Sequence, residues 1–328
     1  MNFEFSNNLK YFQTGIFNVL NDKKAELIKQ GKKVYNLSVG TPDFEPDEHV
    51  KQALINCAKN SENWKYSLND MPELIDALIS YYKNRFNVNL NSDEIMSVYG
   101  SQEGLTHIGF SLCNKNDIVL VPNPGYPIFE IGPYLSGAEI AYYPLLPENN
   151  YLPDLDKIDE DILKRTKFMV VSYPMNPVCA TAPLEFYDEL ILFAKKHNII
   201  IIHDNAYSDI VYDGKCGGSF LSHEGAKEVG VEFYSLSKSF NITGARVSFV
   251  VGNSEIIKHF KMLRSQIDYG IFKPIQHAAI AALTGPQDSV KLHCKEYEKR
   301  RNALCRGLSK IGWSVPDSKG SMFAWAPI

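Results

Sequence analysis

The segment from Ser235 to Arg246 combines residue types that could do chemistry together. It reads Ser-Leu-Ser-Lys-Ser-Phe-Asn-Ile-Thr-Gly-Ala-Arg, so Lys238 stands among hydroxyl groups upstream of Arg246. A lysine amine forms Schiff bases once desolvation or nearby cations lower its pKa, and an arginine fork binds phosphate through two hydrogen bonds. We expect Ser235 and Ser237 to share one strand face and to reach the same anion. The alternative is a solvated surface loop.

A second candidate is Asp204, which follows the apolar run from Ile199 to Ile202. Such a run is typical of a strand buried on both faces, and ligands of open α/β sheets bind where these strands end. A buried ionised carboxylate is costly without a cationic partner, so Asp204 is expected to face a positive group of a ligand. His203 should point to the opposite face and is interpreted as structural, packed under a helix.

A third candidate is the turn Tyr99-Gly-Ser-Gln-Glu-Gly104, which opens an apolar helix. Free backbone N–H groups and the helix dipole make such a start an anion site. Serine followed by glutamate is also an ordinary helix cap, so this segment alone leaves both interpretations open.

Apolar segments that alternate between strand and helix patterns must position these groups. This alternation predicts an α/β architecture with a mainly parallel sheet. A helix is expected over Pro183–His197 from its apolar stripe. The expected strands are Ile118–Val121, Phe168–Ser172, Ile199–His203, Glu232–Leu236 and Val247–Val251.

Both ends of the chain fall outside the alternation. Residues 1–45 are interpreted as an amino-terminal arm and part of a small domain, and 46–287 as the large domain. A long helical pattern runs from Asp288 to about Ile311, and a strand-like stretch follows at Met322–Trp325. We interpret 288–328 as a partial carboxyl-terminal small domain, because one strand and one helix cannot cover each other's apolar faces.

Composition excludes several classes of protein. The 328 residues carry 34 basic and 38 acidic side chains without a basic stripe, so a nucleic-acid partner is not expected. No apolar run is long enough to cross a bilayer, and the amino terminus lacks a signal-peptide pattern. The six cysteines are scattered without a CxxC pair. We therefore expect a cytoplasmic protein with reduced thiols, no membrane contact and no metal site.

Taken in order, these motifs resemble the class I/II aminotransferases, which are pyridoxal-5'-phosphate (PLP) enzymes of fold type I. The resemblance runs from about Asn36 to the last residue and rests on the Ser-Leu-Ser-Lys segment and on Asp-Asn-Ala-Tyr at 204–207. Segments at 36–44, 72–74 and 274–276 look most like the LL-diaminopimelate and aspartate aminotransferase subgroup. The resemblance implies a mixed sheet flanked by helices and a second, smaller α+β domain.

The resemblance also implies roles for single residues. Lys238, Asp204 and Tyr207 would be catalytic: Lys238 holds PLP as a Schiff base and moves a proton, and Asp204 pairs with the pyridine nitrogen. Tyr207 and Asn176 are similar to residues that bind the phenolic oxygen, and Gly40 and Asn176 to those that meet the substrate carboxylate. The other cofactor-binding positions would be Ser101, Gln102, Glu103, Ser235, Ser237 and Arg246 at or near the phosphate, Tyr126 on the ring, and Tyr66 reaching the phosphate of a second copy.

The implied activity is transfer of an amino group between an α-amino acid, such as diaminopimelate or aspartate, and a 2-oxo acid such as 2-oxoglutarate. It would follow a ping-pong mechanism in a homodimer. A C–S β-lyase of the same fold is an alternative, because both reactions begin with loss of the α-proton. A PLP-binding protein without turnover is another.

Two departures from the family pattern bear on these alternatives. The chain reads Asn176-Pro-Val-Cys179 where most relatives read Asn-Pro-Thr-Gly, so the turn after the asparagine is expected to differ. The family pattern also continues past Ile328 with an arginine for the substrate carboxylate, and no residue here corresponds to it. We therefore expect an incomplete small domain, in either a piece of a longer enzyme or a chain that holds PLP but transaminates poorly.

Overall fold

A computed structural model describes residues 1–12 and 16–326 of the chain, which forms two compact units, Met1–Pro42 and Asp43–Ile328. The first unit contains the 3₁₀ helix η1 (Asn7–Tyr11) and the helix α1 (Ile16–Lys29). All elements named below belong to the second unit.

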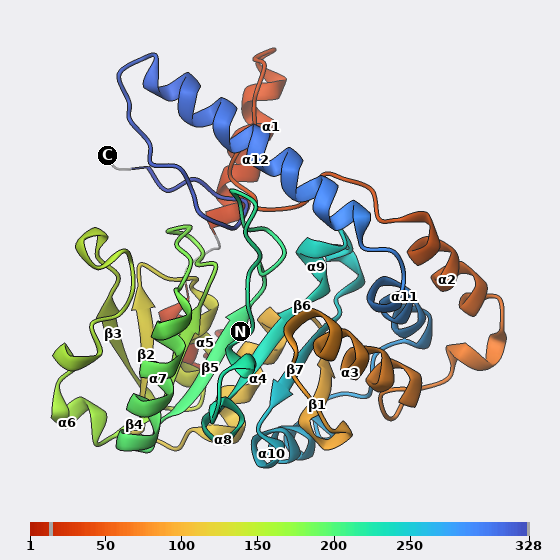
Figure 1. Ribbon diagram of the computed structural model, residues 1–328, viewed down its shortest axis with the longest axis vertical. Coiled ribbons are helices and arrows are strands. Elements are labelled where there is room, and N and C mark those ends of the chain that lie inside the picture. The colour runs from red at the N-terminus through yellow and green to blue at the C-terminus, as the bar shows by residue number, and fades with distance from the viewer. Residues whose placement is uncertain (13–15, 327–328) are drawn as a thin grey trace. The chain divides into compact units, whose positions relative to one another are not determined.

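Within the described residues, seven strands form one sheet in the order β1-β7-β6-β5-β4-β2-β3 (Figure 1). Among these, β7 alone runs antiparallel to the other six, so the mainly parallel mixed sheet is confirmed. The strands are β1 (Ile95–Val98), β2 (Ile118–Asn123), β3 (Glu139–Pro144), β4 (Thr166–Ser172), β5 (Ile200–Asn205), β6 (Gly230–Ser235) and β7 (Ser248–Gly252).

All five expected strands are present, whereas the sequence did not predict β1 and β3. The four residues of β1 give too short an apolar pattern, and β3 lies at the sheet edge with three of its six residues exposed.

The helices lie on both faces of this sheet. The α-helices are α2 (Glu48–Ala58), α3 (Pro72–Phe86), α4 (Ser101–Leu112), α5 (Ile128–Leu135), α6 (Glu160–Leu163), α7 (Leu184–His197), α8 (Ala226–Val229), α9 (Leu236–Ser239), α10 (Ser254–Arg264), α11 (Lys273–Thr284) and α12 (Asp288–Ser309). The short 3₁₀ helices are η2 (Ser61–Trp64), η3 (Ser92–Glu94), η4 (Pro147–Asn149), η5 (Leu155–Lys157), η6 (Phe220–Ser222) and η7 (Thr243–Ala245).

Two apolar cores sandwich the sheet because neighbouring residues of each strand point to opposite faces. On β5, Ile201 packs into the core shared with α2, α3, α7 and α11, whereas Ile202 packs into the core shared with α4, α5 and α10. Both side chains are fully buried. This burial explains the uninterrupted apolar run, and it fixes the face to which each following polar residue points.

The carboxyl-terminal region departs from expectation at one point. The helix α12 is present, but Met322–Trp325 is not a strand. A strand requires a ladder of bonds to a neighbouring strand. Among the described residues this region makes an isolated bridge between Val211 and Gly320, and Phe323 O accepts a bond from Ser318 Oγ at 2.8 Å. The apolar alternation was therefore misleading here.

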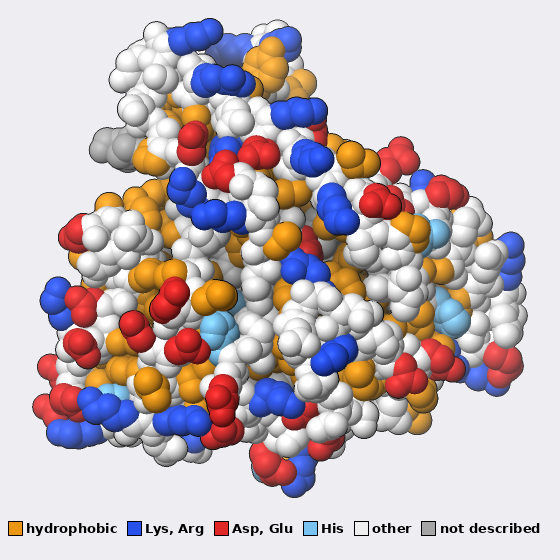
Figure 2. All heavy atoms as spheres, in the orientation of Figure 1, with side chains coloured by type: hydrophobic (Ala, Val, Ile, Leu, Met, Phe, Trp, Pro, Cys, Tyr) orange, Lys and Arg blue, Asp and Glu red, His pale blue; other side chains and the backbone are white. Residues whose placement is uncertain are grey.

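The surface mixes charges of both signs. On the face drawn in Figure 2, lysine and arginine side chains are interspersed with aspartate and glutamate, and neither sign gathers into a large patch. No helix in the described part of the chain has the length and apolar character that a membrane span requires.

Candidate active site

The carboxyl ends of four parallel strands bring most of the candidate residues to one edge of the sheet. Strand β4 ends at Ser172, β5 continues through Asp204, and β6 ends at Ser235. Ser172 and Asp204 are register partners, so their side chains share one face. The turn after β1 opens α4 at the same edge. The fold therefore places a carboxylate, several hydroxyls and a helix start where open sheets bind ligands.

Asp204 is buried at this edge, and its Oδ1 has no hydrogen-bond partner among the described residues. Burial raises the pKa of Asp204 to about 7; His203 opposes the shift and Glu232 adds to it. The Oγ of Ser172 is likewise buried and unpartnered. Buried polar groups are normally hydrogen-bonded, so both atoms point to a polar ligand. Ser172 was not among the predicted site residues, although the sequence places it at the polar end of a buried strand, next to the strand of Asp204.

Lys238 lies in the single helical turn α9, which starts directly after β6. The expectation that Ser235 and Ser237 share a strand face is wrong. The strand ends at Ser235, whose Oγ caps the turn by accepting a bond from Ser237 N at 3.2 Å. Ser235 Oγ also accepts from Ser248 Oγ at 3.1 Å. Burial, followed by repulsion from Arg246, lowers the pKa of Lys238, which favours the neutral, nucleophilic amine.

Arg246 faces the start of α4. Its Nη2 donates to Tyr99 O at 3.3 Å and its Nη1 to Thr243 O at 3.0 Å, while the side chain remains exposed to solvent. Gly100 has φ +85°, and a Cβ there would lie 2.2 Å from Nη2, so the approach requires glycine. Ser101 Oγ is buried without a partner in the described chain. The helix start, this hydroxyl and the guanidinium together form a cradle for an anion.

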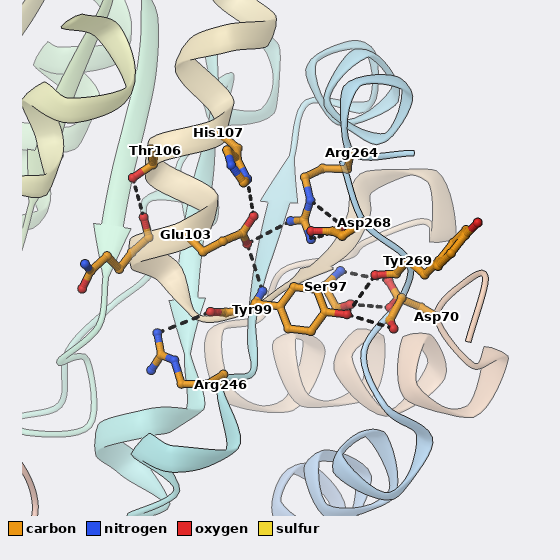
Figure 3. Close-up of polar contacts among 12 residues, drawn as sticks. Asp70, Ser97, Tyr99, Glu103, Thr106, His107, Arg246, Arg264, Asp268 and Tyr269 are labelled. Atoms are coloured by element: carbon orange, nitrogen blue, oxygen red, sulfur yellow. Dashed lines mark hydrogen bonds and ion pairs between the residues drawn. The ribbon is translucent and has the colours of Figure 1, made fainter. Parts of the chain in front are cut away.

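Glu103 lies in the first turn of α4, but its carboxylate is occupied within the protein (Figure 3). Oε2 accepts from Tyr99 N at 3.0 Å and from Arg264 Nη1 at 2.9 Å, and Oε1 bonds to His107 Nδ1. Gln102 instead accepts a bond from Tyr126 OH through its Oε1 at 3.1 Å. Glu103 therefore supports the cradle indirectly, through the backbone of Tyr99, and its pairing with Arg264 was not predicted from the sequence.

The remaining candidates differ in how they are placed. Burial and the nearby Asp204 raise the pKa values of both Tyr126 and Tyr207, so these two phenols share the electrostatic surroundings of that carboxylate. Asn176 is half-buried in the loop after β4. Tyr66 is exposed and packs against Tyr269 at 4.8 Å between ring centroids. Gly40 belongs to the Met1–Pro42 unit, so the set described here is made by the second unit alone.

The turn with the unusual sequence is tightly built. Cys179, the last residue of the Asn176-Pro-Val-Cys turn, adopts the left-handed conformation at φ 64°. Its N–H donates to Met175 O at 2.8 Å, and its carbonyl accepts from Lys319 N at 3.1 Å. The turn thus keeps a glycine-type backbone although its side chain is a buried thiol.

The fold and this edge of the sheet define an enzyme of the PLP-dependent transferase type, and comparison with known proteins agrees. Residues 32–328 match the family described as aminotransferase class I and II, and the chain belongs to that family. It is 42% identical to the LL-diaminopimelate aminotransferase of Halothermothrix orenii over 327 residues, which are 99% of this chain and 84% of that protein. The corresponding protein of Dehalococcoides mccartyi is 41% identical over 95% of this chain and 81% of its own.

Among solved structures, substrate-bound BacF from Bacillus subtilis superimposes with a TM-score of 0.95 at 35% identity. The match covers 100% of this chain and 84% of that one. The fold type I architecture, the PLP-dependent aminotransferase class and the PLP cofactor are thereby established.

The residues present fit PLP. Its pyridine nitrogen needs an anion, and Asp204 offers a buried oxygen with no other partner in the described chain. Its phosphate needs donors, and the Ser101 hydroxyl, the α4 start and Arg246 offer them around a glycine that leaves room. Its aldehyde needs an amine of lowered pKa, which Lys238 supplies.

Proposed function

We propose that this protein transfers an amino group between an α-amino acid of the diaminopimelate or aspartate type and a 2-oxo acid such as 2-oxoglutarate, in two half-reactions. The observation that carries the proposal is that a lysine of lowered pKa lies at the same sheet edge as Asp204, whose buried Oδ1 has no partner among the described residues, beside an anion cradle. The relatives named LL-diaminopimelate aminotransferase support the choice of substrate.

Each residue has a defined task in this proposal. When bound, PLP supplies an electron sink for the electron pair left by removal of the α-proton. Lys238 would hold the aldehyde group and afterwards, as a free amine, take the α-proton and return it to a different carbon. Asp204, kept anionic by the pyridinium, would hold that ring nitrogen in its protonated form.

The surrounding residues would bind and orient. The phosphate would be bound by the hydroxyls of Ser101, Ser235 and Ser237 and by the side chains of Gln102 and Arg246. Tyr126 would lie against the ring. Tyr207 and Asn176 would bind the phenolic oxygen, and Asn176 would also meet the substrate carboxylate. Glu103 would act indirectly, by fixing the first turn of α4.

We further propose that two copies pair in the cytoplasm through the surface around Tyr66. Large apolar side chains are exposed there: Trp64, Tyr66, Leu68, Ile267 and Tyr269, of which Tyr66 is 79% exposed. Exposed apolar groups concentrated in this way are typical of a protein interface.

We also propose that the chain divides into residues 1–45, an arm with part of a small domain, residues 46–287, the large domain, and residues 288–328, a partial small domain. Residues 327–328 lie outside the described part.

One assay tests the activity. The protein, loaded with PLP, is incubated with LL-diaminopimelate or aspartate and 2-oxoglutarate, and glutamate is measured. Formation of glutamate only when both substrates are present supports the proposal. Release of pyruvate and ammonia from a sulfur-containing amino acid without an acceptor indicates the β-lyase instead. Bound PLP without either product indicates a protein without turnover.

A further inference from the structure

The guanidinium of Arg264, at the end of α10, is buried between two carboxylates of different elements (Figure 3). Its Nη1 donates to Glu103 Oε2 at 2.9 Å, and its Nη2 donates to Asp268 Oδ2 at 2.7 Å. Its Nε makes a further bond to Asp268 Oδ1 at 3.2 Å. A buried arginine held in this way is costly to desolvate and strongly fixed in direction. The catalytic residues assigned above give it no task.

One end of this network reaches the phosphate cradle. The carboxylate of Glu103 that binds Arg264 also accepts the backbone N–H of Tyr99 at 3.0 Å. The carbonyl of the same Tyr99 accepts the bond from Arg246 Nη2 at 3.3 Å. Arg264 is thus connected to Arg246 through one side chain and one peptide, and it fixes the backbone on which Gly100 and the start of α4 depend.

The other end reaches the exposed aromatic surface. The hydroxyl of Tyr99 donates to Tyr269 O at 2.9 Å and Gly270 O at 3.1 Å, while Arg264 lies 5.6 Å from the centre of the Tyr99 ring. Gly270 N in turn donates to Ser67 O at 2.6 Å, next to Tyr66. The segments that carry Tyr66 and Tyr269 are therefore fixed to the residue whose carbonyl orients Arg246.

Charge gives Arg264 a second effect on the cradle. Glu103 places a carboxylate in the first turn of α4, close to where a phosphate would lie. Without a cation this carboxylate would repel the phosphate, and the low local dielectric would make the repulsion stronger than in water. Arg264 offsets the charge of Glu103, and the remaining negative charge of the network lies on Asp268, outside α4, so the helix start retains its attraction for anions.

We propose that Arg264 is a positioning residue that holds the phosphate cradle and the Tyr66–Tyr269 surface as one unit, so that PLP binding and pairing of two copies strengthen each other. The inference rests on the proposed function, since it assumes both the cofactor in the cradle and a second copy at the aromatic surface. Thermodynamic linkage then requires that PLP tighten the dimer by the same factor by which the dimer tightens PLP.

The test measures two constants on the full chain. The PLP dissociation constant is obtained by titration followed by absorbance, and the dimer dissociation constant by sedimentation with and without PLP. The variants are Arg264→Met, Arg264→Lys, and the neutral triple variant Arg264→Met with Glu103→Gln and Asp268→Asn. Lys258→Met is the matched control, because it removes an exposed cation of α10 that pairs only with Glu255 in the described chain.

For Arg264→Met we expect both constants to rise about tenfold or more and the effect of PLP on dimerisation to disappear. Arg264→Lys should recover part of the PLP affinity, because lysine keeps one ion pair but not the fork. The triple variant removes the unpaired charges that could prevent folding. It should bind PLP more tightly than Arg264→Met, because the repulsion is gone, while still lacking the coupling.

Four other results would be decisive in different ways. PLP binding within twofold of the wild type in folded Arg264→Met overturns the positioning role alone. If PLP tightens the dimer of the triple variant by the same factor as in the wild type, the positioning role is also overturned, because Arg264 would then act only through its charge. A wild type that binds PLP but never dimerises overturns the coupling, and one that does not bind PLP overturns the proposed function together with this inference.

Discussion

Two neighbouring residues of β5, His203 and Asp204, lie on opposite faces of the sheet in opposite chemical situations. On the His203 face, the buried carboxylate of Glu232 has four partners. They are Tyr82 OH, Ser219 Oγ, Phe220 N and His203 Nδ1, at 2.8 to 2.9 Å. These four contacts satisfy the Glu232 carboxylate within the protein itself.

On the other face, Asp204 is also buried but has an oxygen that no described residue satisfies. Its pKa is raised to about 7 by burial, which means that the isolated protein resists its ionisation. A buried polar group that the protein satisfies serves the structure, and one that it leaves open serves a ligand. The difference between the two faces therefore separates a structural carboxylate from a functional one.

Removal of the amine at this open face should have the largest effect. Lys238→Ala removes the only group proposed both to hold the cofactor and to move the proton, so turnover should become undetectable. Borohydride reduction of PLP-loaded wild type, followed by peptide mapping, should place the label on Lys238. Label on another lysine would contradict the assignment, and Lys258→Ala, which changes an exposed lysine, serves as the control.

Replacement of the carboxylate itself is expected to have the next largest effect. Asp204→Ala leaves the ring nitrogen without its anion, and loss of a buried charge partner costs about 3–5 kcal/mol. If this loss falls on the transition state, kcat should fall roughly hundredfold or more. Asp204→Asn keeps the shape without the charge and should be similarly slow. Near wild-type kcat in either variant would show that the charge is not required.

The contrast between the two faces could be predicted from sequence, because strand alternation is a local rule. The apolar run before His203 identified a buried strand, and alternation alone placed His203 on the face opposite Asp204. Its packing under α7 is confirmed by the contact with Tyr187, at 5.5 Å between ring centroids. The Lys238 segment was recognisable because its chemistry is concentrated within a few residues.

What could not be predicted depends on distant partners or on where an element ends. Arg264 and Glu103 are 161 residues apart, and no local pattern pairs them. Ser237 was assigned to a strand face because the residue types do not reveal that the strand stops at Ser235 and turns into a helix. Met322–Trp325 has strand-like residues but pairs with no strand in the part of the chain that the structure describes, since pairing is a property of the whole fold.

The satisfied face offers a matched test. Glu232→Gln replaces the carboxylate by an amide of similar size, which turns one acceptor into a donor facing the existing donors. The free energy of unfolding should fall by about 3 kcal/mol, because a buried charge-assisted network is broken. PLP affinity should change little, since Glu232 faces away from the site. A large loss of PLP affinity with unchanged stability would reverse the roles assigned to the two faces.

The open face should also reveal itself in the pH dependence of stability when PLP is absent. The pKa of Asp204 is about 7 in the folded chain and near 3.8 when unfolded, so between these values the folded state binds an extra proton. Stability must then decrease as pH rises through this window. From pH 5 to pH 7 the Asp204 contribution should fall by about 2 kcal/mol, at 1.36 kcal/mol per unit while the shift is fully expressed. Asp204→Asn cannot titrate, so its unfolding free energy relative to wild type, measured with urea, should rise by that amount over the same range. Parallel curves for the two proteins would mean that Asp204 is already ionised and compensated without the cofactor, and the distinction between the two faces of β5 would then fail.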